Sequence, residues 1–362
     1  MQKIGILGLG EGRSTISAVL NSKKWELKAI CDLNIELCKQ RAKEFDFHNY
    51  TTNYEDLLND PEIDVIGIYT PDHLHAMHMK MALSHGKHVV CTKPLLDDLT
   101  DAASLLELSR KVGKRVFVGQ SSRFFEPMKR QRTDFEKGEI GELVTVEAHY
   151  NADHRWFLGK GWSLQKSFKW LFDGLSHPVD FIRWYLPEID EVMGYGMLSP
   201  NGVAGGLKNE DTMHFIFKAK DGRIARVSGS YSGPVQPAIR ESEMSCVLRG
   251  TEGCSQADYM DLRYTIADKN GEDKQITFDD QLKYYFRFEG KSHHAGEYNN
   301  YLEHFADSIN NDFTAYPDLE EGVGTMALLK TMEKTLASGK PERVQETIEE
   351  YGLAPFLTSS YF

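Results

Sequence analysis

Two stretches of the chain carry residue types that could act in proton transfer. Lys93 follows an apolar run at residues 88–91, and Pro94 behind it stiffens the backbone, so its ammonium group could be held over a bound cofactor. Asp173 and His177 are spaced by one helical turn, which would place an acid and an imidazole on one face of a helix. Imidazole takes up and releases a proton near neutral pH. The alternatives are that Lys93 is a surface lysine, that Asp173 is a helix N-cap and that His177 is a partly buried histidine whose hydrogen bonds are satisfied within the fold.

A glycine-rich turn near the start of the chain could bind the phosphates of a nucleotide. The apolar run at residues 4–7 leads into Gly8-Leu9-Gly10-Glu11-Gly12-Arg13-Ser14, and a helical apolar face follows. A first glycine allows the tight turn, a second lets the backbone approach a pyrophosphate, and the helix N-terminus offers N–H groups. Asp32, at the end of the next apolar run, could accept hydrogen bonds from a ribose. Arg13 stands where a third glycine is usual, and an ordinary turn between a strand and a helix is the alternative.

Short apolar runs alternate with helical patterns through the first third of the chain. The predicted strands cover residues 4–7, 27–30, 64–70, 88–91 and 115–119, and the predicted helices beyond the glycine turn cover 34–45, 53–58, 73–85 and 99–112. This alternation is typical of a doubly wound parallel sheet, the Rossmann arrangement. Such sheets bind ligands beyond the carboxyl ends of their strands. The residues that the pattern places there are Thr70, Pro71, His75, Lys93, Gln120 and Arg123.

After residue 122 the pattern changes to alternating strands joined by tight turns. Strands are predicted at 144–150, 192–198, 212–219, 223–231 and 244–249, and helices at 128–137, 173–185, 297–310 and 318–336. We therefore expect an α/β protein with a dinucleotide-binding domain at 1–122 and an α+β domain at 123–362, whose open sheet is mostly antiparallel. The last three helices would cover one face of that sheet. The helix at 297–310 carries an apolar stripe that we interpret as core: Tyr298, Tyr301, Leu302, Phe305 and Ile309.

Composition and charge narrow the class of protein. The 362 residues are enough for two domains with substantial cores, and 41% hydrophobic and 27% charged residues are ordinary for a globular protein. A formal net charge of −12 argues against non-specific nucleic-acid binding. The first predicted strand begins at Lys3 and no apolar run approaches the length of a membrane span. We therefore expect no secretory leader, no membrane association and a cytoplasmic location.

The cysteines and histidines do not indicate a metal centre. Cysteine occurs at positions 31, 38, 91, 246 and 254, an odd number without C-x-x-C spacing, so neither a disulfide framework nor a structural zinc site is expected. His293-His294 could reach a pocket, but the sequence identifies no further ligands for a metal.

Aromatic and basic residues gather in an irregular segment just before Asp173. Flat aromatic faces suit the C–H faces of a sugar ring, so this segment could shape a substrate pocket. The alternative is a packed loop in which tryptophan forms core. The candidates are His154, Arg155, Trp156, Trp162, Lys169 and Trp170.

In their order and spacing, these motifs resemble the glucose-fructose oxidoreductase and inositol 2-dehydrogenase family (Gfo/Idh/MocA). The matching segments are Gly8 with Gly10, Thr70-Pro71-Asp72 with His75, residues 86–89, Lys93-Pro94-Leu95, Arg123-Phe124, residues 138–141, and Asp173 to Asp180. The chain departs from the family pattern where Thr92 replaces a glutamate, Asp72 an asparagine and Arg13 a glycine. Thr92 removes a carboxylate that would interact with the lysine or the nicotinamide region.

The resemblance implies that Lys93 contacts the reacting hydroxyl and that His177 is the acid/base, with Asp173 beside it. A hydride leaves a carbinol carbon only as the hydroxyl proton is removed, so a base and a cation near the oxygen fit this reaction. We expect Lys93 and His177 on opposite sides of one pocket. The candidate substrate-binding residues are Lys93, Arg123, Arg155, Trp156, Trp162, Lys169, Trp170, Asp173 and His177.

These observations favour an NAD-dependent oxidoreductase acting on a hydroxyl or keto carbon of a sugar, sugar derivative or cyclitol. The alternatives are an NAD-retaining glycoside hydrolase that works by transient oxidation and elimination, and a non-catalytic nucleotide-binding regulatory protein. NAD is favoured over NADP because the carboxylate of Asp32 would repel a 2′-phosphate, although Arg13 could reach one. The candidate cofactor-binding residues are Gly8, Gly10, Glu11, Gly12, Arg13, Ser14, Asp32, Thr70, Pro71, His75, Lys93 and Gln120.

The second domain's sheet is also the expected route to oligomers. The predicted helices suffice to cover one face only, and relatives commonly pair sheet against sheet, so we expect a homodimer or homotetramer. The segment at 223–231 has polar residues on both of its faces, and a solvated sheet is therefore the alternative.

Overall fold

The computed structural model describes residues 1–160, 164–165, 167–236, 242–287 and 295–357. The chain forms two compact units, one of residues 1–124 with 283–323, the other of residues 125–282 with 324–362. The predicted domain boundary after residue 122 lies next to the first division, but residues 283–323, which we had assigned to the second domain, belong to the first unit. Trp162 and the pair His293-His294 lie outside the described residues.

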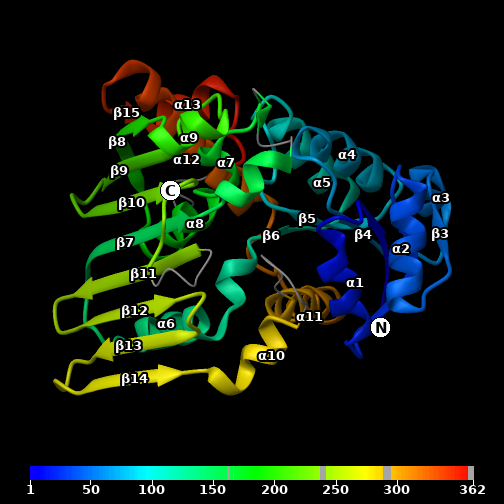
Figure 1. Ribbon diagram of the computed structural model, residues 1–362, viewed down its shortest axis with the longest axis horizontal. Coiled ribbons are helices and arrows are strands. Elements are labelled where there is room, and N and C mark those ends of the chain that lie inside the picture. Colours follow the sequence, from blue (N-terminus) through cyan, green and yellow to red (C-terminus); the bar gives the residue numbers. More distant parts are fainter. Residues whose placement is uncertain (161–163, 166, 237–241, 288–294, 358–362) are drawn as a thin grey trace. The chain divides into compact units, whose positions relative to one another are not determined.

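The first unit is built on a six-stranded sheet with the order β3-β2-β1-β4-β5-β6 (Figure 1). All of its strand pairs are parallel, which confirms the predicted Rossmann sheet. Its strands are β1 (Gln2–Leu7), β2 (Trp25–Cys31), β3 (Tyr50–Thr51), β4 (Val65–Ile68), β5 (His88–Thr92) and β6 (Val116–Gly119). The short strand β3 was not predicted, because two residues are too few for a recognisable alternation.

The helices of this unit begin and end where local sequence signals place them. They are α1 (Gly12–Leu20), α2 (Ile35–Phe45), α3 (Tyr54–Asn59), α4 (His75–Ser84) and α5 (Ala102–Val112), with single 3₁₀ turns at Asp72–Leu74 and Ser121–Phe124. The Asn34 side chain caps α2 by accepting backbone N–H bonds, Asn53 does the same for α3, and Gly113 ends α5 in the left-handed conformation.

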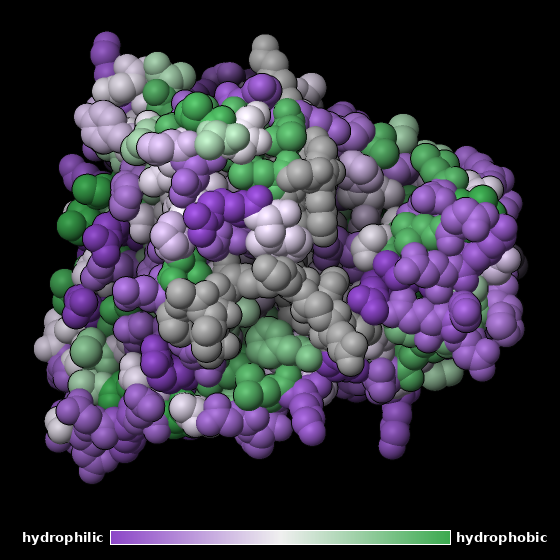
Figure 2. Space-filling model, viewed as in Figure 1, coloured by the Kyte–Doolittle hydropathy of each residue, from purple (hydrophilic) through white to green (hydrophobic). Residues whose placement is uncertain are grey.

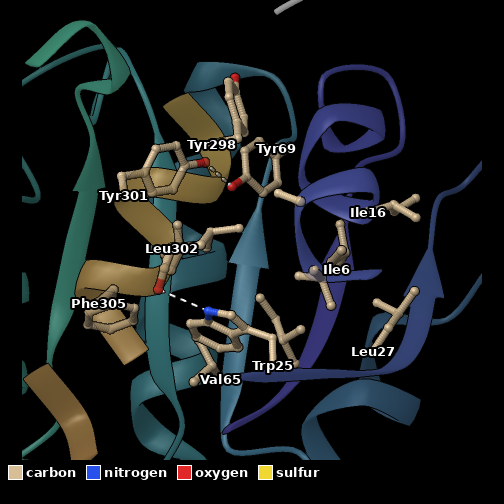
Figure 3. Close-up of a cluster of buried hydrophobic side chains, with 14 of the residues drawn as sticks. Ile6, Ile16, Trp25, Leu27, Val65, Tyr69, Tyr298, Tyr301, Leu302 and Phe305 are labelled. Carbon is tan, nitrogen blue, oxygen red and sulfur yellow. Dashed lines mark hydrogen bonds between the residues drawn. The ribbon is translucent and has the colours of Figure 1, made fainter. Parts of the chain in front are cut away.

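Helix α11 (Gly296–Asn311) completes the core of the first unit (Figure 3). The predicted stripe Tyr298, Tyr301, Leu302 and Phe305 is buried, so its interpretation as core is confirmed. The Trp25 Nε1–H donates to the carbonyl of Leu302 at 2.9 Å, and the hydroxyls of Tyr69 and Tyr301 are 2.7 Å apart. Our expectation that this helix covers the second sheet was wrong, because its stripe packs on α1 and the first unit's aromatic core.

The second unit contains a nine-stranded sheet with the order β14-β13-β12-β11-β7-β10-β9-β8-β15. Only β10 and β7 run parallel, so the mostly antiparallel character is confirmed. Its strands are β7 (Leu143–Ala152), β8 (Ile189–Met197), β9 (Thr212–Ala219), β10 (Ile224–Ser230), β11 (Ser242–Gly250), β12 (Cys254–Asp258), β13 (Arg263–Ala267), β14 (Asp273–Thr277) and β15 (Glu342–Arg343).

Helices pack against one face of this sheet. Contacts with the sheet come from α6 (Glu126–Glu136) on β12 and β13, from α8 (Ser176–Tyr185) on β7 and β10, and from α13 (Val344–Glu350) on β8. The remaining helices are α7 (Trp170–Asp173), α9 (Pro200–Gly205), α10 (Leu282–Tyr285) and α12 (Leu319–Ser338). The helix that we predicted at about 173–185 is α8, which ends at Tyr185 as expected but begins only at Ser176, because Asp173 ends the separate helix α7.

The face of the first unit drawn in Figure 2 is mostly hydrophilic. The hydrophobic patches on that face are small. Among the described residues, no helix combines the length and the apolarity needed to span a membrane.

Candidate active site

The glycine turn between β1 and α1 has the close backbone approaches that the sequence predicted. Gly8 has φ +88°, and a Cβ there would stand 2.5 Å from the Tyr69 carbonyl group, so no other residue fits. A Cβ at Gly10 would meet no atom within 4 Å, which leaves open space above the turn. Gly12 is the first residue of α1 and lies close to the Ile6 side chain. It therefore allows the close helix-strand packing that a third glycine would provide at the position of Arg13.

The carboxylate of Asp32 is fixed by the backbone on both sides. Its Oδ2 accepts the Leu9 N–H at 2.9 Å, and its Oδ1 accepts the Asn34 N–H at 2.8 Å. Asp32 thus lies at the carboxyl end of β2 and contacts the glycine turn. Each carboxylate oxygen has a further lone pair with which it can accept a ribose hydroxyl.

Arg13, which the sequence left as a possible phosphate ligand, is engaged in an ion pair. Its guanidinium donates to Oε1 of Glu44 at 2.5–2.6 Å. Arg41 donates to Oε2 of the same carboxylate at 2.8 Å and, through Nε, to the carbonyl of Leu9 at 3.0 Å. Sequence reasoning missed Glu44 and Arg41, because no motif marks two charged residues on a helix distant from the turn.

His75 connects the segments that follow β4 and β5. Its Nε2 lies 2.7 Å from the Thr70 carbonyl oxygen and its Nδ1 2.9 Å from that of Pro94. The side chain is 1% exposed, and this burial lowers the pKa of His75. Because a neutral imidazole carries one N–H, His75 donates to one of these two carbonyl oxygens and lies against the other. Lys93, which is half-buried, immediately precedes Pro94.

Gln120 at the end of β6 carries a buried polar atom without a hydrogen-bond partner among the described residues. That atom is its Oε1, and the residue is 3% exposed. An unsatisfied acceptor of this kind usually has a functional explanation. Arg123, three residues later, is 4% exposed and pairs with Glu321 of the same unit at 2.8 Å. This buried pair fixes the turn after β6 to the start of α12.

In the second unit, Asp173 and His177 flank a junction between two short helices. Gly174 and Leu175 separate α7 from α8, and the backbone N–H of His177 donates to the carbonyl of Gly174 at 3.3 Å. Pro178 in the first turn of α8 has no N–H, so a helix continuous through this point would lose a bond. The imidazole of His177 packs edge-on against Tyr150 of β7, with ring centroids 5.9 Å apart.

The aromatic residues before Asp173 form a packed cluster. Trp170 is 2% exposed, and its ring lies 4.8 Å from Tyr231 and 5.1 Å from Tyr150, measured between centroids. Trp170 thus has the packed environment that we considered as the alternative, and its role and that of Trp156 in substrate binding stay predictions. His154 is part of the cluster through edge contacts with Trp156 and Trp170. Tyr150, which lies on β7, was not identified from sequence, since strand alternation does not show which partner a side chain meets.

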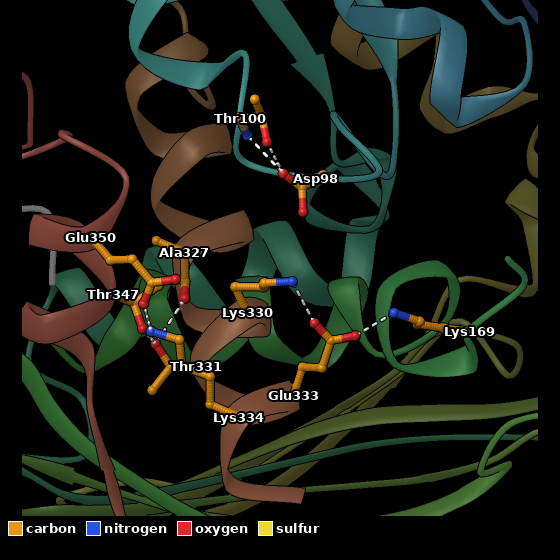
Figure 4. Close-up of polar contacts among 10 residues, drawn as sticks. All are labelled: Asp98, Thr100, Lys169, Ala327, Lys330, Thr331, Glu333, Lys334, Thr347 and Glu350. Carbon is orange, nitrogen blue, oxygen red and sulfur yellow. Dashed lines mark hydrogen bonds and ion pairs between the residues drawn. The ribbon is translucent and has the colours of Figure 1, made fainter. Parts of the chain in front are cut away.

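Two basic candidates of the second unit are paired with acids. Arg155 makes a two-pronged contact with Asp153 at 2.5–2.6 Å, and this hydrogen-bonded partner holds the pKa of Asp153 below its usual range. Lys169 pairs with Glu333, whose other carboxylate oxygen accepts from Lys330 (Figure 4). These contacts hold both candidates in defined positions, and their roles in substrate binding stay predictions.

The structure thus brings the sequence-predicted residues together in two groups. Gly8, Asp32, Thr70, Lys93 and Gln120 follow the strands of one parallel sheet in the first unit. Asp173 and His177 flank the junction of α7 and α8 in the second unit. The placement of Lys93 and His177 on opposite sides of one pocket stays a prediction.

Comparisons with known proteins agree with this two-part construction, which is that of a dinucleotide-dependent oxidoreductase. The model of an oxidoreductase family with an NAD-binding Rossmann fold matches residues 2–120, and the C-terminal domain model of the same Gfo/Idh/MocA family matches residues 129–255. The two matches together span well over half of the chain. The protein belongs to the Gfo/Idh/MocA oxidoreductase family, as the resemblance implied.

Similar proteins include whole-length and partial matches. The uncharacterized oxidoreductase YrbE of Bacillus subtilis is 25% identical over 95% of this chain and 96% of its own. Inositol 2-dehydrogenase of Salmonella typhimurium is 29% identical over 51% of this chain and 55% of its own length. The structure of levoglucosan dehydrogenase in complex with NADH and levoglucosan has a TM-score of 0.82 at 19% identity, covering 95% of this chain and 99% of that one. The last likeness shows the shared fold.

Proposed function

We propose that the protein transfers a hydride between NAD and a hydroxyl or keto carbon of a sugar, sugar derivative or cyclitol. The observation that carries this proposal is the glycine turn joined to Asp32: Gly8 leaves no room for a side chain, and the Leu9 N–H of the turn holds the carboxylate at the end of β2. The buried, unpartnered Oε1 of Gln120 adds an acceptor at the same edge of the sheet. The residues present therefore fit a dinucleotide, which would supply the hydride acceptor or donor.

The chain's own residues would provide the proton chemistry. Lys93 would donate a hydrogen bond from Nζ to the reacting oxygen and stabilise its developing negative charge. His177 would accept the hydroxyl proton at an imidazole nitrogen, with Asp173 nearby to favour the charged ring. Thr92 in place of a glutamate leaves Lys93 without that neighbouring carboxylate.

The sugar or cyclitol class of substrate is supported by named relatives. Inositol 2-dehydrogenase and levoglucosan dehydrogenase are similar to this chain, and both are dehydrogenases of such compounds. They favour net oxidation over the two alternatives, redox-neutral glycoside hydrolysis and a non-catalytic regulatory role. A cytoplasmic location stays a prediction.

The test is a panel of sugars and cyclitols assayed with NAD⁺ and NADP⁺ by the absorbance of the reduced nicotinamide. We expect one or more substrates to give reduced cofactor, with NAD⁺ preferred. Release of an aglycone from a glycoside without net formation of reduced cofactor would instead identify the hydrolase. Tighter binding of NADP⁺ than of NAD⁺ would contradict the assignment of Asp32.

We further propose that the chain forms a dimer or tetramer through the sheet face that α6, α8 and α13 leave uncovered. Tyr195 of β8, Ile216 of β9 and Ile224 of β10 lie on that face and are more than half exposed. A cross-strand ladder from Arg226 through Glu147 to Arg249 also lies there, so a solvated face is the alternative.

A further inference from the structure

Three charged side chains beside the glycine turn form one compact group. Arg13 comes from the first turn of α1, and Arg41 and Glu44 lie one turn apart on α2. Glu44 is the shared partner, with Oε1 bound to Arg13 and Oε2 bound to Arg41. The side chains are 24%, 11% and 24% exposed, respectively, so water screens these pairs less than it would at an open surface.

This group lies next to the acid that selects the ribose. The N–H of Leu9 donates to Asp32, and the carbonyl of the same residue accepts from Nε of Arg41. Because one residue spans at most about 3.6 Å of backbone, the Arg41 guanidinium and the Asp32 carboxylate flank the same short stretch of the turn. If Asp32 binds the ribose, a substituent on the ribose 2′-oxygen would therefore have a carboxylate and a guanidinium close to it.

The charges of the four side chains that bond to this turn or to one another balance. Arg13 and Arg41 are cationic, and Glu44 and Asp32 are the anions that oppose them. Arginine forks are the usual protein ligands of a 2′-phosphate in NADP-binding sites. Two arginine side chains are present beside the turn in this protein, but the guanidinium groups of both are bound to the carboxylate of Glu44.

We infer that Glu44 is a specificity-determining residue for the cofactor, and that it excludes NADP by holding Arg13 and Arg41 in ion pairs next to Asp32. The inference rests on dinucleotide binding by the first unit, but not on the identity of the substrate. If Glu44 acts in this way, removing its charge leaves the region with a net positive charge and two guanidiniums without their carboxylate. A purely structural Glu44 would affect stability and leave the ratio of the two affinities unchanged.

The experiment is a titration of the wild type and of E44Q with NADH and with NADPH, followed by nicotinamide fluorescence at low ionic strength. We expect E44Q to bind NADPH about tenfold more tightly than the wild type, while the affinity for NADH changes by less than about threefold. The matched control is E36Q, which removes an equal charge from the same helix. Glu36 pairs with Lys39 and not with the arginines, so E36Q should retain the wild-type ratio.

Two further variants keep the inference testable if E44Q does not fold. R13Q removes one of the two cations bound to Glu44, leaves Arg41 as its partner and should shift the ratio further toward NADH, and E44D keeps the charge and should retain the preference. An unchanged ratio in E44Q, or in R13Q where E44Q is unfolded, overturns the inference. Failure of the wild type to bind either dinucleotide would instead contradict cofactor binding itself, so the two failures are distinguishable.

Discussion

The indole ring of Trp170 lies across Gly174, so closely that a methyl group added at Gly174 would stand 2.2 Å from the ring. Trp170 is almost completely buried against Tyr150 and Tyr231, and its ring has no space into which to move. Gly174 is therefore required by packing, at the junction that separates Asp173 from His177.

We predict that Gly174→Ala destabilises the protein by about 2 kcal/mol or more, because overpacking a rigid core forces side chains and backbone out of position. Denaturant unfolding followed by tryptophan fluorescence measures this change. The control is Gly10→Ala, whose added methyl meets no atom within 4 Å. It should leave stability unchanged and weaken NADH binding, because Gly10 lies where the backbone approaches the pyrophosphate. Equal stability of the two variants would contradict the role given to Gly174.

The same junction shows what the sequence could and could not reveal. The four-residue spacing of Asp173 and His177 correctly predicted helical structure around both residues, but the spacing alone suggested one helix. Pro178 was the available signal for a new helix start, since proline is tolerated in a first turn and disrupts an interior. The contact between Trp170 and Gly174 depends on a rotamer and on the neighbouring strands, and local periodicity does not encode either.

Other differences between the predicted and the observed structure also arise from tertiary contacts that local sequence does not encode. The stripe on α11 predicted burial correctly, but an apolar stripe does not specify which core it enters. Glu44 and Arg41 meet Arg13 only because α1 and α2 lie on the same sheet, so their ion pairs depend on tertiary structure. By contrast, the parallel sheet and its glycine turn were predictable, because every strand except β3 contains a short apolar run and Gly8 needs a backbone conformation that other residues rarely adopt.

Asp318, just before α12, gives a prediction for pH. Its carboxyl accepts the N–H of Glu321 at 2.9 Å, and burial raises the pKa of Asp318 to about 6. In the unfolded chain the pKa of Asp318 has its ordinary value of 3.8. Burial of the ionised carboxylate therefore lowers the free energy of unfolding progressively as pH rises from about 4 to about 6. Above about pH 6 the full loss of stability is on the order of 3 kcal/mol.

We therefore expect Asp318→Asn, which keeps the capping acceptor, to raise the melting temperature at about pH 7 and to give no gain at about pH 4. Asp46→Asn is the control, since the Asp46 side chain is 96% exposed and asparagine suits its left-handed conformation. A melting temperature of Asp318→Asn that differs from the wild type equally at both pH values would show that burial of the charge is not the cause.

Lys93 and His177 are predicted to act on the same substrate oxygen. Replacing either residue by alanine should lower kcat by about two to four orders of magnitude, because alkoxide stabilisation or proton transfer is lost. The melting temperature of both variants, and the cofactor affinity of the His177 variant, should stay close to the wild type. Lys80→Ala, on α4 in the first unit, is a control for the loss of a lysine, because Lys80 pairs with Asp101 and is not one of the candidate site residues. Near-native turnover of a Lys93 or His177 variant would remove that residue from the mechanism.

The uncovered face of the second sheet leads to the last prediction, on oligomeric state. Ile216 of β9 lies on that face, opposite Arg226 of β10 and Met193 of β8, and is 56% exposed. Burying such a face against a second copy would remove apolar area from water and cover the strands. In a solvated face, the ion pairs of Arg226, Glu147 and Arg249 would instead face water.

Light scattering at micromolar concentration should give about two or four times the 41.2 kDa of one chain. Ile216→Asp should lower that mass to a single chain, and Met77→Asp, at a similarly exposed apolar position on α4, should not. A wild-type mass of 41.2 kDa would exclude the oligomer and leave the sheet face to solvent.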